Sequence, residues 1–262
     1  MLTRRVLSAI VLLPVVLAAA YVGGPLFAAL VSLAALLAGF EFYRIMRRIS
    51  YQPSYAVGLA LIALSMWDAY NPSLGIRGWA VPAAVMALLV WYILRQDTEG
   101  FLENWALTVT GALYTGVLAG YLVSLRNLPN GLNWLLLAFL GTWTCDTTAY
   151  LVGSRWGRRG FFTNISPNKT VEGAVGGCLA GIVVVSAVGW YLGLSVWQAP
   201  VLGTLLVVGV TLGDLAESLI KRRVGTKDSG DIIPGHGGML DRIDSLLFSA
   251  PVVYYFVTWL VL

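Results

Sequence analysis

Apolar residues fill long stretches of the chain, and short polar segments separate them. Nine such stretches follow one another along the 262 residues. They cover approximately residues 6–21, 25–43, 55–67, 79–94, 105–125, 133–152, 174–192, 197–220 and 245–262. A helix that crosses a bilayer needs roughly 20 mostly apolar residues, so this pattern predicts an all-α, polytopic integral membrane protein with about nine transmembrane helices. Because the third stretch is short and suits a re-entrant segment, eight spans remain an alternative.

The composition supports a membrane protein. Only 11% of the residues are charged, against about 25% in soluble proteins. The first stretch, with Arg4 and Arg5 before it and alanines at 18–20 near its end, resembles a secretory signal. The eight stretches that follow favour a retained first span. The two cysteines, Cys145 and Cys178, lie inside apolar stretches, so no disulfide framework or CxxC metal site is expected.

The basic residues are distributed very unequally between the two sides of the predicted membrane. With alternating loops, fifteen of the 17 Lys and Arg residues fall on the amino-terminal side, and only Arg77 and Arg126 fall on the other. The positive-inside rule therefore predicts a cytoplasmic amino terminus, and we expect a bacterial inner (cell) membrane. The net charge of +4 then reflects a one-sided basic face that suits anionic lipid headgroups and nucleotides, and nucleic acid is not expected as a partner.

We find no soluble domain or clear repeat, so residues 1–262 are expected to form a single membrane domain. Residues 1–130 contain spans with short loops, whereas residues 131–262 contain three polar clusters and form the expected catalytic half. The predicted polar site faces the cytoplasm, because the clusters lie at the cytoplasmic ends of their spans.

The densest polar run extends from Ser218 to Asp244 and joins the last two spans. On a helix, Asp214, Glu217, Ser218 and Lys221 share one face at the end of the eighth span. Further carboxylates, Asp241 and Asp244, stand where the ninth span begins, so two helix ends are expected to present carboxylates to a common point. Hard oxygen ligands without Cys or His neighbours favour Mg²⁺. The alternative is an ordinary salt-bridge network of Asp214 and Glu217 with Lys221 and Arg222.

The loop inside this cluster suits phosphate binding. Five glycines stand beside Lys221, Arg222 and Lys227, and glycine lets backbone N–H groups approach phosphates closely. The glycines are Gly225, Gly230, Gly235, Gly237 and Gly238. His236 is the single histidine. A phosphate hydrogen bond or a loop-shaping role suits it better than general-base catalysis, because a phosphate nucleophile is mostly dianionic at neutral pH and needs no base.

Two further clusters lie upstream. Ser166, Lys169, Thr170 and Glu172 precede the seventh span. Lys169 and Thr170 suit an anionic headgroup or a triphosphate, and Glu172 is a further acidic candidate. Helix capping explains Thr170 poorly, because Gly173 stands where a capping box has Glu or Gln. Asp146 lies inside the sixth span, and an ionisable group there is a functional candidate, the alternative being a hydrogen bond to a neighbouring Ser or Thr.

The segment from Ser218 to Asp244 resembles the signature of phosphatidate cytidylyltransferases, also called CDP-diacylglycerol synthases. The resemblance rests on Ser218, Lys221-Arg222, Lys227-Asp228, Gly230, Pro234, His236-Gly237-Gly238, Asp241-Arg242 and Asp244. Asp146 and the segment Ser166–Gly173 resemble upstream segments of the family. Asn168 departs from a lysine often found there, and residues 1–130 resemble the family in hydropathy alone.

The resemblance implies a membrane enzyme, a nucleotidyltransferase, that condenses CTP with phosphatidic acid to CDP-diacylglycerol and pyrophosphate. It further implies a homodimer and dependence on Mg²⁺, with one or two cations left open. Catalytic roles are expected for Lys221, Arg222, Lys227, Asp228, His236 and Asp241. Substrate binding is expected for Ser166, Lys169, Thr170, Glu172, Ser218, Lys221, Arg222, Gly237, Gly238 and Arg242. The expected metal ligands are Asp214, Asp241, Asp146 and Asp244, of which Asp214 and Asp241 match the family positions.

Two other functions remain as alternatives. A CTP-dependent lipid kinase of the polyprenol or phytol type would use similar phosphate and metal ligands, but its hydroxyl acceptor would make a base such as His236 indispensable. An ion-coupled transporter would use Asp146 and Asp214 near mid-membrane, yet transporters favour broken helices in paired halves.

Overall fold

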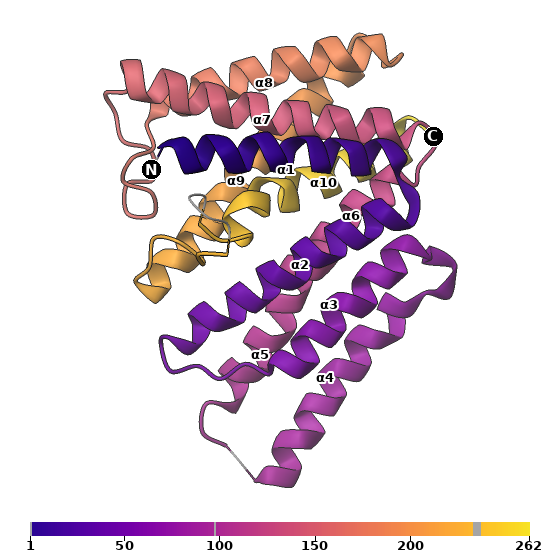
Figure 1. Ribbon diagram of the computed structural model, residues 1–262, viewed down its shortest axis with the longest axis vertical. Coiled ribbons are helices and arrows are strands. Elements are labelled where there is room, and N and C mark those ends of the chain that lie inside the picture. Colours follow the sequence, from indigo (N-terminus) through magenta and orange to yellow (C-terminus); the bar gives the residue numbers. More distant parts are fainter. Residues whose placement is uncertain (1, 97, 233–236) are drawn as a thin grey trace. The chain divides into compact units, whose positions relative to one another are not determined.

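The computed structural model of the chain describes residues 2–96, 98–232 and 237–262. Within these ranges helices make up all the regular structure (Figure 1), which confirms the all-α fold. The helices are α1 (Leu2–Val22), α2 (Gly24–Arg47), α3 (Tyr55–Tyr70), η1 (Pro72–Leu74), α4 (Ile76–Arg95), α5 (Phe101–Ala112), η2 (Leu113–Val117), α6 (Leu118–Arg126), α7 (Gly131–Trp156), α8 (Val171–Tyr191), α9 (Gln198–Val224) and α10 (Leu240–Leu260).

Each of the nine apolar stretches lies in a helical segment. The fifth stretch is continuous through α5, the π-helical turn η2 and α6. Among the described residues, seven helices are long and apolar enough to cross a membrane, and Leu12–Val22 and Tyr55–Tyr70 are shorter apolar helices. The polytopic membrane architecture is therefore confirmed, while the number of nine spans stays a prediction.

The chain forms two compact units. The first contains residues 1–127 together with Val224–Arg242, and the second contains Leu128–Arg223 together with Ile243–Leu262. The segment 224–242, which carries most of the signature, therefore groups with the amino-terminal helices. The single-domain organisation with a division at residue 130 stays a prediction.

In the first unit, α2 packs closely against α3 and α5. The Tyr43 hydroxyl on α2 donates a hydrogen bond to the backbone carbonyl of Thr108 at 2.7 Å. A Cβ atom at Gly58 on α3 would overlap the Tyr43 ring, and one at Gly111 on α5 would meet the rings of Phe42 and Tyr43. Figure 1 shows α2, α3 and α4 running side by side, with α3 packed against both of the others. The carboxy-terminal half of α2 is thus held by close packing in this unit.

An arginine fixes the junction between the end of α1 and the start of α2. Arg126, the last residue of α6, donates hydrogen bonds to the carbonyls of Ala20 at 2.7 Å and Tyr21 at 3.0 Å. The last carbonyls of a helix have no partner within the helix, so Arg126 satisfies two such groups at the end of α1. The chain then turns at Gly23, whose φ is 69°.

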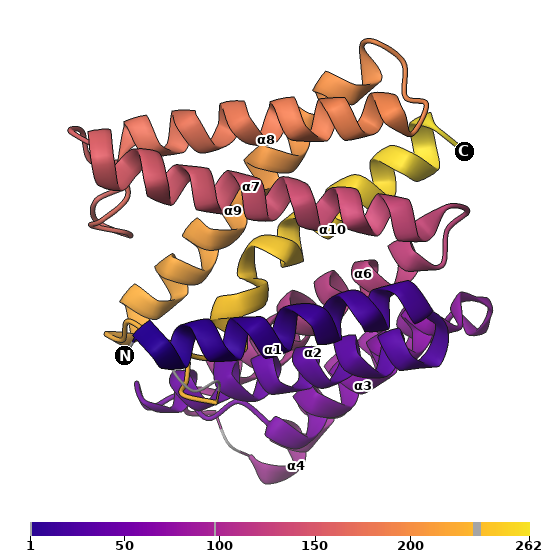
Figure 2. The ribbon, with the colours of Figure 1, turned by 45° about the horizontal axis from the view of Figure 1, so that its top comes forward.

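In the second unit, α7 and α8 form a tightly packed pair (Figure 2). A Cβ atom at Gly177 of α8 would lie 2.6 Å from the Cys145 carbonyl of α7, so only glycine permits this approach. Helix α9 packs on α10 through Gly213, where a Cβ atom would lie 2.6 Å from the Asp244 carbonyl. Close backbone packing of this kind is how helices associate in a membrane.

Candidate functional site

The second unit contains a pocket of about 540 Å³ at the end of α7 that leads into the loop before α8. Its walls come from α7, α8, α9 and the intervening loop. The lining residues are Cys145, Asp146, Ala149, Tyr150, Gly153, Ser154, Phe161, Asn168, Lys169, Thr170, Gly173, Ala174, Thr211 and Asp214. Four residues predicted from the sequence therefore line one pocket: Asp146, Lys169, Thr170 and Asp214.

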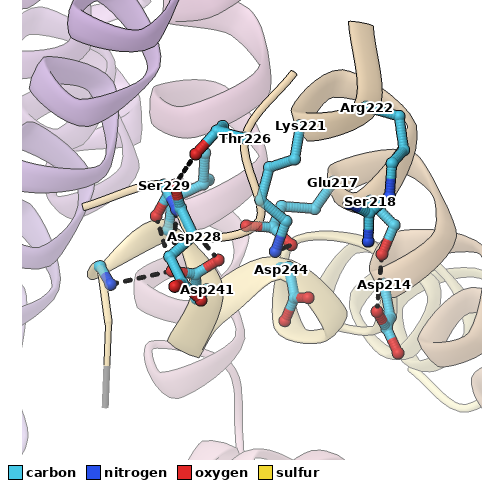
Figure 3. A network of polar contacts seen from close by, with 12 residues as sticks. Asp214, Glu217, Ser218, Lys221, Arg222, Thr226, Asp228, Ser229, Asp241 and Asp244 are labelled. Atoms are coloured by element: carbon cyan, nitrogen blue, oxygen red, sulfur yellow. Dashed lines mark hydrogen bonds and ion pairs between the residues drawn. The ribbon is translucent and has the colours of Figure 1, made fainter. Parts of the chain in front are cut away.

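An ion pair joins two of the pocket's predicted residues. Lys169 Nζ lies 2.7 Å from Asp214 Oδ2, and the two side chains are 25% and 35% exposed. The Ser218 hydroxyl, one helical turn further along α9, makes a long 3.5 Å hydrogen bond to Asp214 Oδ1 (Figure 3). The salt-bridge alternative assigned Asp214 to Lys221 or Arg222, whereas the structure pairs it with a lysine from the second polar cluster.

The rest of the predicted α9 face makes internal contacts. Lys221 pairs with Glu217, whose side chain is almost completely buried, as the salt-bridge alternative predicted. Arg222 donates from Nε to the Ile165 carbonyl at 2.9 Å. Arg222 thus ties the end of α9 to the loop that carries Ser166 and Lys169.

Three carboxylates of the second unit lie within electrostatic range of one another. Asp146 and Asp244 each interact with the charge of Asp214, and Asp244 also interacts with Lys221. The Ser245 side chain makes a hydrogen bond to Asp146, so the alternative proposed for Asp146 is present as a contact. Within the described parts of the chain, no group of three His, Cys, Asp or Glu side chains forms a preassembled metal centre.

The donor set nevertheless fits a hard cation by its chemistry. Asp146, Asp214 and Asp244 offer carboxylate oxygens, the ligands that Mg²⁺ prefers. Three negative charges close together near the end of apolar helices repel one another, and a bound cation would relieve that repulsion.

The loop before α8 is organised by Thr170 and Glu172. The Thr170 hydroxyl accepts a hydrogen bond from Gly173 N at 3.1 Å and caps α8. The expectation that capping explains Thr170 poorly is therefore wrong, because a capping threonine needs only the backbone N–H of that third residue and not a Glu side chain. Glu172 accepts from the backbone N–H groups of Arg158 at 3.0 Å and Arg159 at 3.1 Å. The Glu172 carboxylate thus holds the residues that follow α7 against the first turn of α8.

Ser166 belongs to a turn next to Lys169. Its carbonyl accepts a hydrogen bond from Lys169 N at 3.2 Å. This turn sets the direction in which the Lys169 side chain leaves the loop. Substrate binding by Ser166, Thr170 and Glu172 stays a prediction.

In the first unit, Asp241 accepts several hydrogen bonds at the start of α10. Its Oδ2 accepts from Ser229 Oγ at 2.9 Å, Ser229 N at 3.1 Å and Gly238 N at 2.8 Å (Figure 3). The Thr226 hydroxyl donates to the Asp228 carbonyl at 3.0 Å, and Lys227, Asp228 and Arg242 are exposed.

Some predictions for this segment remain open. Gly237 has a φ of 81°, which only glycine adopts readily. The predicted role of His236 lies outside the described residues. Because Asp214 and Asp241 belong to different units, their convergence on one metal also stays a prediction.

The sequence interpretation missed two buried polar residues, Glu41 and Ser229. Both side chains have zero exposure, and the Ser229 hydroxyl lies 3.2 Å from Glu41 Oε2. The signal for Glu41 was present in the sequence: it is a carboxylate inside the apolar stretch 25–43, the same feature that singled out Asp146. Ser229 stands in a polar segment and carried no comparable signal.

Comparison with known proteins adds an independent line of argument. The model of the cytidylyltransferase family matches residues 3–260. A phosphatidate cytidylyltransferase of Synechocystis sp. is 33% identical over 98% of this chain and 97% of its own length. Proteins of the same name from Bacillus subtilis and Staphylococcus haemolyticus are 40% identical over 66% of this chain and 65% of theirs, and 33% identical over 95% and 96%. The similarity thus extends through residues 1–130, where the sequence alone indicated only hydropathy.

Proposed function

The chain belongs to the cytidylyltransferase family, and from this premise we propose that it transfers the cytidylyl group of CTP to phosphatidic acid, forming CDP-diacylglycerol and pyrophosphate. The observation that carries the proposal is the pocket of the second unit, where Lys169 meets the carboxylates of Asp146 and Asp214, which stand inside apolar helices. A cationic amine beside acidic metal ligands is the combination that nucleotide phosphates require.

The reaction is an in-line displacement at phosphorus. An oxygen of the phosphatidate phosphate forms a new bond to the α-phosphorus of CTP, and the bond from that phosphorus to the oxygen bridging to the β-phosphate breaks. The electron pair leaves with pyrophosphate. Because a phosphate monoester has its second pKa near 6, the nucleophile is mostly dianionic at neutral pH and needs no general base.

Lys169 is the central cationic group of this proposal. It is the one Lys or Arg among the described residues that line the pocket, and its flexible ammonium can transfer its hydrogen bond from Asp214 to a phosphate oxygen. Lys221 and Arg222 then supply positive charge near the leaving pyrophosphate, with Lys227 and Asp228 as further catalytic groups. Their distances to a substrate stay predictions.

A divalent cation, Mg²⁺, is the cofactor we infer. Asp146, Asp214 and Asp244 would hold it, together with Asp241 as the resemblance implies. When bound, Mg²⁺ offsets negative charge on phosphate oxygens. Ser218 would orient the Asp214 carboxylate through the hydrogen bond described above.

We also infer the placement of the site and the assembly. The excess of Lys and Arg on one side supports a cytoplasmic site in a bacterial inner membrane, which gives access to CTP in water and to phosphatidic acid in the same leaflet. A homodimer rests on the family resemblance. Mass measurement of the detergent complex at several protein concentrations tests it.

The stereochemical course tests the displacement. With one diastereomer of α-thio-CTP as substrate, a single in-line attack inverts the configuration at the α-phosphorus. Retention in the product would indicate two displacements through a nucleotidyl-enzyme intermediate and would refute direct attack by the lipid phosphate. Omitting Mg²⁺ in the presence of a chelator should abolish turnover, and returning Mg²⁺ should restore it.

A further inference from the structure

Glu41 is a buried carboxylate on α2, far in sequence from every residue assigned above. Its side chain has zero exposure in a helix whose length and hydropathy suit a membrane span. An ionised carboxylate inside such a helix is costly unless other groups compensate its charge. A chain that keeps one must therefore provide partners for it.

The partners of Glu41 lie at the two ends of the signature loop. Its Oε2 accepts a hydrogen bond from Leu240 N at 2.9 Å and lies 3.2 Å from Ser229 Oγ. Leu240 is the first residue of α10, and Ser229 stands eleven residues earlier. One carboxylate oxygen thus ties both ends of the segment 229–240 to α2.

Ser229 connects Glu41 to Asp241. The Ser229 hydroxyl lies 2.9 Å from Asp241 Oδ2 and 3.2 Å from Glu41 Oε2. A hydroxyl carries one proton, so it donates to one of these carboxylates at a time. The Ser229 hydroxyl is therefore shared between the two carboxylates. Each carboxylate has a further fixed donor, Leu240 N for Glu41 and Gly238 N for Asp241, so the position of Ser229 between them depends on both.

Two glycines make room for the Glu41 carboxylate. A Cβ atom at Gly238 would overlap the Ser229 hydroxyl and lie 2.5 Å from Glu41 Oε2, and a Cβ atom at Gly230 would overlap Glu41 Oε1. Within the described residues, Glu41 Oε1 has no hydrogen-bond partner. The signature glycines Gly230 and Gly238 therefore enclose this carboxylate on two sides, in addition to any role they have toward phosphate.

The same side of α2 makes two weaker contacts with the loop. Arg44 pairs with Asp231 at 3.5 Å, and Arg48 donates to the Thr226 hydroxyl at 3.5 Å. Glu41, Arg44 and Arg48 follow one another at helical spacing, so they face one direction. Exposed contacts of this length contribute little energy, which leaves Glu41 as the main anchor.

We propose that Glu41 is a positioning residue: through Ser229 and the amide of Leu240 it fixes the orientation of the Asp241 carboxylate for phosphate transfer. The inference rests on the proposed function, since it assigns Glu41 a part in the work of Asp241. It places a determinant of activity in the amino-terminal helices, outside the catalytic half predicted from the sequence.

Glu41→Gln in the full-length, detergent-purified protein tests the proposal. The variant keeps the size of the side chain and removes its charge. We expect kcat to fall about tenfold to a hundredfold while KM for CTP changes less than threefold, because orientation of Asp241 matters for the transition state and not for binding CTP. Glu103→Gln, the same substitution at an exposed glutamate of α5, is the matched control and should leave kcat unchanged.

Ser229→Ala removes the hydroxyl that links Glu41 to Asp241. It tests the proposal even if Glu41→Gln does not fold. Ser229→Ala should lower kcat about as much as Glu41→Gln does. The kcat of the double variant should be no lower than that of the slower single variant, since both residues act through one hydrogen-bond chain. Wild-type kcat in both variants would overturn the proposal, as would losses that multiply fully in the double variant. If wild type itself transfers no cytidylyl group, the proposed function fails instead.

Discussion

Replacing Lys169 with methionine removes the ammonium group from the pocket while keeping the side chain's length. Lys169 Nζ lies 2.7 Å from Asp214 Oδ2, so it can reach any oxygen atom bound near that carboxylate. A hydrogen bond to a charged group contributes about 1.5 to 3 kcal/mol. Loss of one such bond in the transition state predicts a fall in kcat/KM of about 10- to 150-fold.

The same substitution should change stability much less. The two side chains of the pair are 25% and 35% exposed, and solvent screens such a pair, so its loss contributes about 1 kcal/mol or less. That corresponds to a fall in Tm of about 4 °C or less. A large kinetic effect with a small thermal effect identifies Lys169 as a group that acts on substrate.

The assay measures kcat and KM for cytidylyl transfer in mixed micelles of detergent and phosphatidic acid, together with thermal unfolding. Arg155→Gln serves as the control, because Arg155 is an exposed basic residue at the end of α7 whose guanidinium faces Trp156 at 5.7 Å. A kcat/KM within twofold of wild type would refute the assignment and leave Lys169 as a structural partner of Asp214. A Tm lowered by more than about 10 °C would also count against it.

Three further predictions follow from individual contacts. Asp241→Asn should abolish turnover while the protein still inserts and elutes as wild type on size exclusion; near-normal activity would remove Asp241 from the metal ligands. Thr170→Ala should lower the free energy of unfolding by about 1 kcal/mol through loss of the α8 cap, whereas Thr170→Ser should retain it in denaturant titrations. Gly177→Val should separate α7 from α8, because its Cβ atom would meet the Cys145 carbonyl, and a wild-type Tm would contradict that packing.

The helical membrane architecture could be predicted because it depends on the hydrophobicity of long continuous segments and not on contacts between distant residues. Apolar stretches of about 20 residues admit few structures in a bilayer other than helices, and each predicted stretch lies in a helix. The pocket was also accessible from sequence. Asp146 and Asp214 drew attention because a carboxylate in an apolar span is costly, and Lys169 because it suits a phosphate. The fold brings these three residues to one pocket.

Pairing between distant segments could not be read from local patterns. Spacing on α9 favoured Lys221 or Arg222 as the partner of Asp214, whereas Lys169, 45 residues earlier, takes that place. The contact of Glu41 with Ser229 spans 188 residues. Helical periodicity describes neighbours within one helix and carries no information on which helices meet, so these contacts required the structure.

The most direct test of the function uses CTP labelled at either the α- or the γ-phosphate, with purified protein, Mg²⁺ and phosphatidic acid. Our account predicts that the α-label enters the lipid phase and that the γ-label leaves as pyrophosphate. Transfer of the γ-label to a lipid alcohol would contradict the account and indicate a kinase. If neither labelled form of CTP transfers its label to the lipid phase, the result would also contradict the account and would favour a transport function.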